Sequence, residues 1–205
     1  MEVAGVYDPV LVSLSILVAV FASFAGLSLA RRMVVAGGRA RALWLITAAF
    51  ALGGGIWAMH FVGMLAVSIP GLRISYDPGL TAISFAAPIG LTGSALAIAA
   101  SNVGSRARLA LAGSVMAVGV LAMHYLGMAA MQMHALVGYD PILVSLSVLI
   151  AFVASLVAVW LAFAKHKLVH RLAASLAMGI AIAGMHYTAM SAASFAPSAR
   201  MDASM

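Results

Sequence analysis

Long apolar segments alternate with short polar ones along the whole chain. Six segments have the length that crosses a bilayer, about 20 residues, and they fall near residues 9–30, 42–67, 78–100, 109–133, 141–164 and 172–195. An uninterrupted apolar segment of this length is typical of a transmembrane helix. The pattern therefore predicts an all-α integral membrane protein with six membrane-spanning helices.

The composition supports this prediction and narrows the chemistry. The 205 residues are 65% hydrophobic and 8% charged, with a mean hydropathy of +1.14, whereas a soluble domain carries about 25% charged residues. The chain has no cysteine, which excludes disulfides, thiolate metal sites and cysteine nucleophiles. Any soft metal ligand must therefore come from the 14 methionines.

The charged residues are segregated between alternate connections. Nine of the eleven Lys and Arg residues lie in three of them, namely Arg31, Arg32, Arg39, Arg41, Arg106, Arg108, Lys165, Lys167 and Arg171. All five acids lie on the opposite side, namely Glu2, Asp8, Asp77, Asp140 and Asp202. The positive-inside rule then predicts cytoplasmic basic connections and an external N-terminus. Basic groups so placed meet lipid headgroups, and this distribution argues against nucleic acid as a partner.

A threefold repeat underlies these segments. The odd-numbered segments open on the same three residues, Tyr7-Asp8-Pro9, Tyr76-Asp77-Pro78 and Tyr139-Asp140-Pro141. Aspartate before proline is the expected N-cap of a helix. We expect one domain over 1–205, built from tandem two-helix units near 7–67, 76–134 and 139–195. Three similar hairpins can be related by an axis along the membrane normal, which predicts a pseudo-threefold bundle.

Each unit ends on a motif in which Met-His-aromatic precedes a second methionine. The copies are Met59-His60-Phe61-Val62-Gly63-Met64, Met123-His124-Tyr125-Leu126-Gly127-Met128 and Met185-His186-Tyr187-Thr188-Ala189-Met190. In every copy the histidine and the second methionine are four residues apart, so both side chains lie on one helix face. Ionisable residues within a membrane are expensive. Three of them at one depth therefore predict a shared site at the outer end of the bundle.

Imidazole with thioether, and without thiolate or carboxylate, is a ligand set that suits copper. Zinc gains little from a thioether, and magnesium and calcium prefer oxygen. We therefore predict copper, Cu(I) or Cu(II), held by His60, Met64, His124, Met128, His186 and Met190. His134 is a weaker candidate for a peripheral ligand.

Four hypotheses remain open at this point. A copper-binding sensor leads, and a transporter of copper or another cation is the second. The third is a membrane haem protein with His/His or His/Met ligation or a copper redox protein. The fourth is a purely structural role for the motifs. No catalytic triad, carboxylate pair, phosphate-binding loop or HExxH pattern is visible, so we expect no enzymatic activity.

The motifs also carry a family resemblance. Met185-His186-Tyr187-Thr188 spells MHYT, Met123-His124-Tyr125 keeps three of the letters, and Met59-His60-Phe61 replaces the tyrosine. With its three units, the whole chain resembles the MHYT family of bacterial integral membrane sensor domains. The resemblance implies a copper site built from the motif His and Met residues, which senses oxygen, carbon monoxide, nitric oxide or redox state.

The resemblance also implies a location and partners. The domain would lie in the bacterial inner membrane, with the motif histidines on the periplasmic side. Its cytoplasmic partner would be a cyclic di-GMP enzyme or a histidine kinase. The family is described with seven spans, and six are present here. We therefore expect an isolated sensor portion, with the seventh helix and the output domain absent.

Overall fold

The computed structural model describes residues 5–69, 73–133, 135–164 and 167–197. Its helices are α1 (Pro9–Val35), α2 (Gly38–Ala49), the π-helix η1 (Phe50–Gly54), α3 (Gly55–Leu65), α4 (Pro78–Ser101), α5 (Arg106–Ala129), α6 (Pro141–Phe163) and α7 (Leu168–Ser191). Because α2, η1 and α3 run on as one span, the described part contains 6 helices long and apolar enough to cross a membrane. The predicted all-helical membrane architecture is confirmed.

The helix ends are displaced from those that hydropathy predicts. Arg106, Arg108 and Arg171 lie within α5 and α7 rather than in connecting turns. Long basic side chains have apolar stems, so a helix can continue into the interface while their charges reach water. Conversely, residues 131–133 and 192–195 were expected to be helical and are not, because short strands replace the last helical turn. We call the end of the bundle that carries Arg106 and Arg171 the basic end. The opposite end, where Asp8, Asp77 and Asp140 cap their helices, is the capped end.

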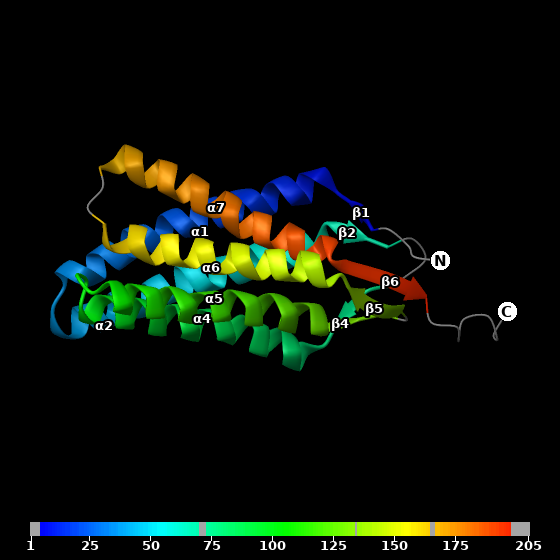
Figure 1. Cartoon of the computed structure of the whole chain (residues 1–205), viewed down its shortest axis with the longest axis horizontal. Coiled ribbons are helices and arrows are strands. Elements are labelled where there is room, and N and C mark those ends of the chain that lie inside the picture. The colour runs from blue at the N-terminus through cyan, green and yellow to red at the C-terminus, as the bar shows by residue number, and fades with distance from the viewer. Residues whose placement is uncertain (1–4, 70–72, 134, 165–166, 198–205) are drawn as a thin grey trace.

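Three two-stranded antiparallel ribbons form at the capped end, and the sequence did not predict them. They pair β1 (Val6–Tyr7) with β2 (Val67–Ser68), β3 (Ser75–Tyr76) with β4 (Met131–Gln132), and β5 (Ala135–Tyr139) with β6 (Ala193–Pro197). Each ribbon joins the opening of a unit to the end of the same unit (Figure 1). The backbone N–H of Asp8 also donates to the Ala66 carbonyl at 2.8 Å, with equivalent bonds in the other units. Each hairpin is thereby closed beside its histidine motif.

The three Tyr-Asp-Pro openings cap their helices as predicted. The Asp8 carboxylate accepts from the backbone N–H groups of Val10 and Leu11, and Pro9 occupies the first helical turn. Asp77 and Asp140 cap α4 and α6 in the same way. These carboxylates satisfy N–H groups that a helix start leaves without partners.

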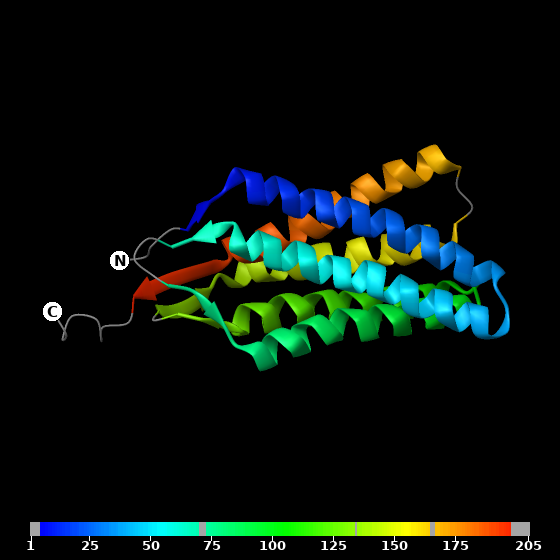
Figure 2. The same ribbon diagram turned by 180° about the vertical axis from the view of Figure 1, so that it is seen from behind.

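Outer helices and histidine-bearing helices alternate around the bundle. α1 packs against α3 and α7, α4 against η1 and α5, and α6 against α5 and α7. Each of these outer helices therefore bridges two spans that carry a histidine motif, as Figure 2 shows from behind. The tandem repeat of the sequence thus becomes a ring of three hairpins, with the three histidine-bearing helices turned toward a shared core.

Candidate metal centre

His60, His124 and His186 meet at the centre of the bundle, near its capped end. They come from α3, α5 and α7, and each is 0% exposed. The Nδ1 atom of His60 lies 3.0 Å from that of His186 and 3.2 Å from that of His124. One ligand nitrogen from each ring lies within 4.8 Å of the others. The predicted convergence of the motif histidines is confirmed.

The three rings stand edge to face around this centre. His60 is 4.9 Å from both other rings by centroid distance, while His124 and His186 are 5.4 Å apart. The motif aromatic next to each histidine packs against its ring at 4.8–5.2 Å. The Nδ1 atoms face inward, and the triad is slightly wider between His124 and His186.

The outward Nε2 atoms of the triad are held by packing rather than by hydrogen bonds. All three are buried and have no hydrogen-bond partner within the described part of the chain. The Nε2 of His60 lies so close to Gly127 that a Cβ there would clash with it, and the Nε2 of His186 lies in the same way against Gly63. Metal-bound histidines normally orient themselves through a hydrogen bond from this second nitrogen. For His60 and His186, the close contact with a glycine orients the ring in place of that hydrogen bond.

The Nδ1 atoms themselves fit a cation. Each nitrogen of a neutral imidazole presents either one proton or one lone pair, so the Nδ1 atom of His60 cannot make a full hydrogen bond to both neighbours. Three lone pairs directed at one cation avoid this mismatch. Three coplanar nitrogens about 2.0 Å from an ion lie roughly 3.5 Å apart, close to the 3.0 and 3.2 Å separations seen here. The residues present therefore fit a metal ion.

Met64, Met128 and Met190 form a second layer toward the capped end. They are 2–4% exposed and belong to one apolar cluster with Val67, Ile69 and Phe195. The structure thus brings the three thioethers together, one helical turn from the imidazoles, beneath the strand ribbons. The methionines that precede each histidine instead belong to the larger core of the bundle. His134 lies outside the described residues.

Three buried serines, which sequence reasoning missed, connect neighbouring units around the triad. The Tyr187 hydroxyl lies 2.7 Å from Ser15 Oγ, and the Tyr125 hydroxyl lies 3.1 Å from Ser147 Oγ. In the first unit the motif aromatic is phenylalanine, and Trp57 Nε1 instead donates to Ser84 Oγ at 3.1 Å. All three serines stand eight residues after the tyrosine of an opening. That common offset was the available signal.

The tyrosines of the Tyr-Asp-Pro openings make a second set of contacts between neighbouring units. Tyr7, Tyr76 and Tyr139 pack against the motif aromatics of the preceding unit, at ring distances of 5.6–6.2 Å. Burial raises the pKa of Tyr76, so its phenol stays neutral. Each histidine motif is therefore locked to the next unit by an aromatic pair and a serine, and the third unit closes on the first.

Comparison with known proteins gives consistent matches. A family model named MHYT, described as the bacterial signalling protein N-terminal repeat, matches residues 53–112 and 118–175, more than half of the chain. Its two matched segments begin 65 residues apart (118 − 53), which lies between the 63 and 69 residues that separate successive Tyr-Asp-Pro openings. No solved structure matches the chain.

Three curated proteins are similar over almost the whole chain. The bifunctional diguanylate cyclase/cyclic di-GMP phosphodiesterase MucR of Pseudomonas aeruginosa is 46% identical over 194 residues, 92% of this chain and 28% of that protein. The signaling protein YkoW of Bacillus subtilis is 34% identical, over 95% of this chain and 25% of its own length. The cyclic di-GMP phosphodiesterase NbdA of P. aeruginosa is 37% identical, over 91% and 24%. The chain thus spans about a quarter of these relatives.

Proposed function

We propose that this chain, which belongs to the MHYT family of membrane-embedded bacterial sensor domains, binds copper at the histidine triad and responds there to a diatomic gas or to redox state. The observation that carries the proposal is the convergence of three buried Nδ1 atoms within reach of one ion. His60, His124 and His186 are the principal ligands. Bound copper would supply an ion that can change oxidation state and accept a small neutral ligand.

The donor set favours copper over the alternatives. The donor groups of the triad and of the adjacent methionine layer are imidazoles and thioethers, and no carboxylate lies among the described residues of these clusters. Such neutral, soft donors suit Cu(I) best. Met64, Met128 and Met190 complete or flank the site from the second layer. Haem fits less well, because imidazole nitrogens on opposite faces of a porphyrin cannot lie 3.0 Å apart.

The surroundings favour a sensor over a transporter. A cation path needs a succession of polar or soft ligands toward the other face of the membrane. On the basic-end side of the triad, Met116, Met178 and Met185 face the central cavity among aliphatic side chains, and Ser155 is the only polar residue in its described lining. This lining offers no imidazole or carboxylate to continue a path toward the basic end, which favours a detector over a transporter.

The signal leaves through the ring of contacts between units. Tyr125 and Tyr187 each touch both their own histidine and a serine of the next unit. A change in the position of one imidazole therefore alters the contact between two hairpins. We propose that an output domain reads this shift. MucR and NbdA, which are named as cyclic di-GMP enzymes, suggest the same class of output here. The chain itself is expected to have no enzymatic activity.

Metal analysis of the purified chain tests the assignment. The protein should retain copper after extensive desalting, show no Soret band, and lose its copper in the His124→Ala and His186→Ala variants. His170→Ala is the matched control, because His170 is exposed near the basic end. Unaltered copper content in both triad variants would remove the basis of the proposal.

Two further measurements separate the finer parts of the proposal. Carbon monoxide added to the reduced, copper-loaded protein should give an infrared C–O stretching band that His186→Ala lacks. Met128→Leu, which keeps the side-chain volume close, should remove sulfur scattering from the copper X-ray absorption spectrum if Met128 is a ligand. An unchanged spectrum in this variant and in the equivalent Met64 and Met190 variants would make these methionines packing residues.

A further inference from the structure

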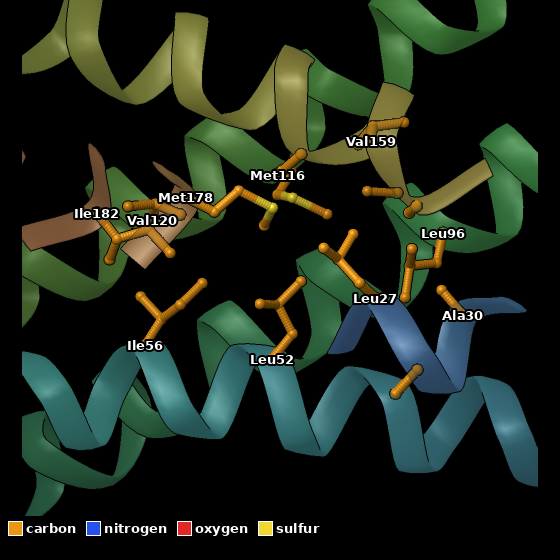
Figure 3. Close-up of a cluster of buried hydrophobic side chains, with 14 of the residues drawn as sticks. Leu27, Ala30, Leu52, Ile56, Leu96, Met116, Val120, Val159, Met178 and Ile182 are labelled. Carbon is orange, nitrogen blue, oxygen red and sulfur yellow. The ribbon is translucent and has the colours of Figure 1, made fainter. Parts of the chain in front are cut away.

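An apolar cavity lies in the core of the bundle on the basic-end side of the triad. Most of its wall comes from residues four and eight positions before each histidine, which Figure 3 labels, namely Leu52, Ile56, Met116, Val120, Met178 and Ile182. Residues at these spacings share one helix face with the histidine. Since four residues rise about 6 Å along a helix, the cavity begins one turn from the triad, on the same axis.

The cavity lies beside α6, whose glycine contact falls nearer the basic end than those of α1 and α4. Gly55 admits Ala22 of α1 and Gly119 admits Leu91 of α4, so those helices press against the histidine-bearing spans. The comparable glycine facing α6 is Gly113, which receives Leu156 nearer the basic end. On α6 itself the residues that face the axis are small.

These small residues leave the space unfilled. Ala151, Ala154, Ser155 and Ala158 form the α6 wall. About 20 Å³ remains for the centre of a water-sized molecule, more than the roughly 10–15 Å³ that one such molecule needs. A buried water requires at least two polar partners, and Ser155 is the only polar side chain in the wall. The cavity is therefore suited to an apolar occupant.

A lipid-facing groove adjoins this cavity. It runs between α6 and α7 and shares Ala154 and Met178 with the cavity wall. Its outer edge is formed by Leu149, Val153 and Val157, which are 60%, 53% and 44% exposed on a membrane-spanning helix. Apolar solutes favour hydrocarbon over water, so the bilayer is the richer source of such a molecule. One alanine and one flexible methionine separate that source from the cavity.

We propose that this cavity binds a small uncharged apolar molecule of about diatomic size, which enters from the lipid bilayer between α6 and α7. Ala154 and Met178 form the passage, and Met178 can open it by a change of rotamer, since methionine is unbranched and flexible. From the cavity, the molecule would reach the triad one helical turn away. That delivery matters only if the triad is the proposed copper sensor, whereas binding in the cavity does not depend on the proposed function.

Xenon is the probe for the binding site, because dry apolar cavities accept it. Crystals of the full chain, pressurised with xenon, should show an anomalous peak in the cavity both with and without copper. Ala151→Ile should abolish the peak by filling the space, and Met116→Ala should raise its occupancy by enlarging the space. Ala86→Ile on the exposed face of α4 is the control. Absence of xenon from the cavity of both the native chain and Met116→Ala overturns the proposal, even if copper binds.

The route is tested separately in lipid nanodiscs by xenon exchange NMR. Ala177 lies on α7 in the outer groove and not in the cavity wall. Ala177→Phe should therefore slow xenon exchange without changing occupancy, while Ala86→Phe should leave both unchanged. An exchange rate in Ala177→Phe equal to that of the native chain rules out the passage between α6 and α7.

Discussion

The Nε2 atom of His60 approaches Gly127 so closely that a Cβ on that residue would clash with it. A hypothetical methyl at that position would also fall 3.0 Å from the ring Cδ2. His186 has the same relationship to Gly63. In the third unit the corresponding residue is Ala189, and His124 and His186 are the pair with the wider ring separation, 5.4 Å. Glycine in the motif is thus a requirement for the tightest approach of the rings.

Gly127→Ala should therefore displace the His60 ring while leaving the bundle folded. Because His60 is the imidazole that contacts both others, we expect copper affinity to fall by about 10–100-fold, the range seen when outer contacts of a metal ligand are lost. Competitive titration with a Cu(I) chelator measures this. Gly184→Ala is the control, since a Cβ there meets nothing within 4 Å. Native affinity in Gly127→Ala would show that the ring is not held by this contact.

Gly53→Ala should destabilise the first unit without touching the triad. A Cβ at Gly53 would lie 2.7 Å from the Pro88 carbonyl oxygen and 2.8 Å from the Ile89 backbone, and backbone cannot move aside as a side chain can. Overpacking of this kind costs about 1–3 kcal/mol. Thermal unfolding in detergent should show a lower Tm, whereas Gly90→Ala, which points into open space, should retain the native value. Equal Tm values would mean that η1 adjusts without cost.

Trp57 substitutes for a missing tyrosine hydroxyl in the first unit. Trp57→Phe removes the hydrogen bond to Ser84 and should reduce stability by about 1 kcal/mol. Adding Phe61→Tyr should recover most of that loss, because the other two units use a tyrosine at this place. Unfolding of the single and double variants measures the recovery. In a Ser84→Ala background, Phe61→Tyr should bring no gain, and a gain there would refute the pairing.

The orientation in the membrane can be read with single cysteines, since the native chain has none. Ser68 is exposed at the capped end and Gly104 is exposed at the basic end. From the positive-inside rule, Ser68→Cys should react with a membrane-impermeant maleimide in intact cells. Gly104→Cys should react only after the membrane is permeabilised. The reverse labelling pattern would place the triad on the cytoplasmic side.

Much of this protein follows from the sequence by itself. Six apolar segments of spanning length leave no other way to satisfy the backbone in lipid than helices or closed barrels, and their helical form follows from their length. The spacing of Tyr-Asp-Pro and Met-His gave the three units and the convergence of His60, His124 and His186. Local chemistry was sufficient here, because caps and helix faces depend on residues only a few positions apart.

The tertiary structure alone decided how the site is held and what surrounds it. The ribbons pair segments about 60 residues apart, such as Val6 with Ser68, and hydropathy does not encode such pairings. Whether Nδ1 or Nε2 faces the axis depends on Gly63 and Gly127 of neighbouring units. The cavity beside α6 depends on where the glycine contacts between helices fall along the bundle. These features arise from close packing between distant segments, whereas periodicity records only the face that each segment turns inward.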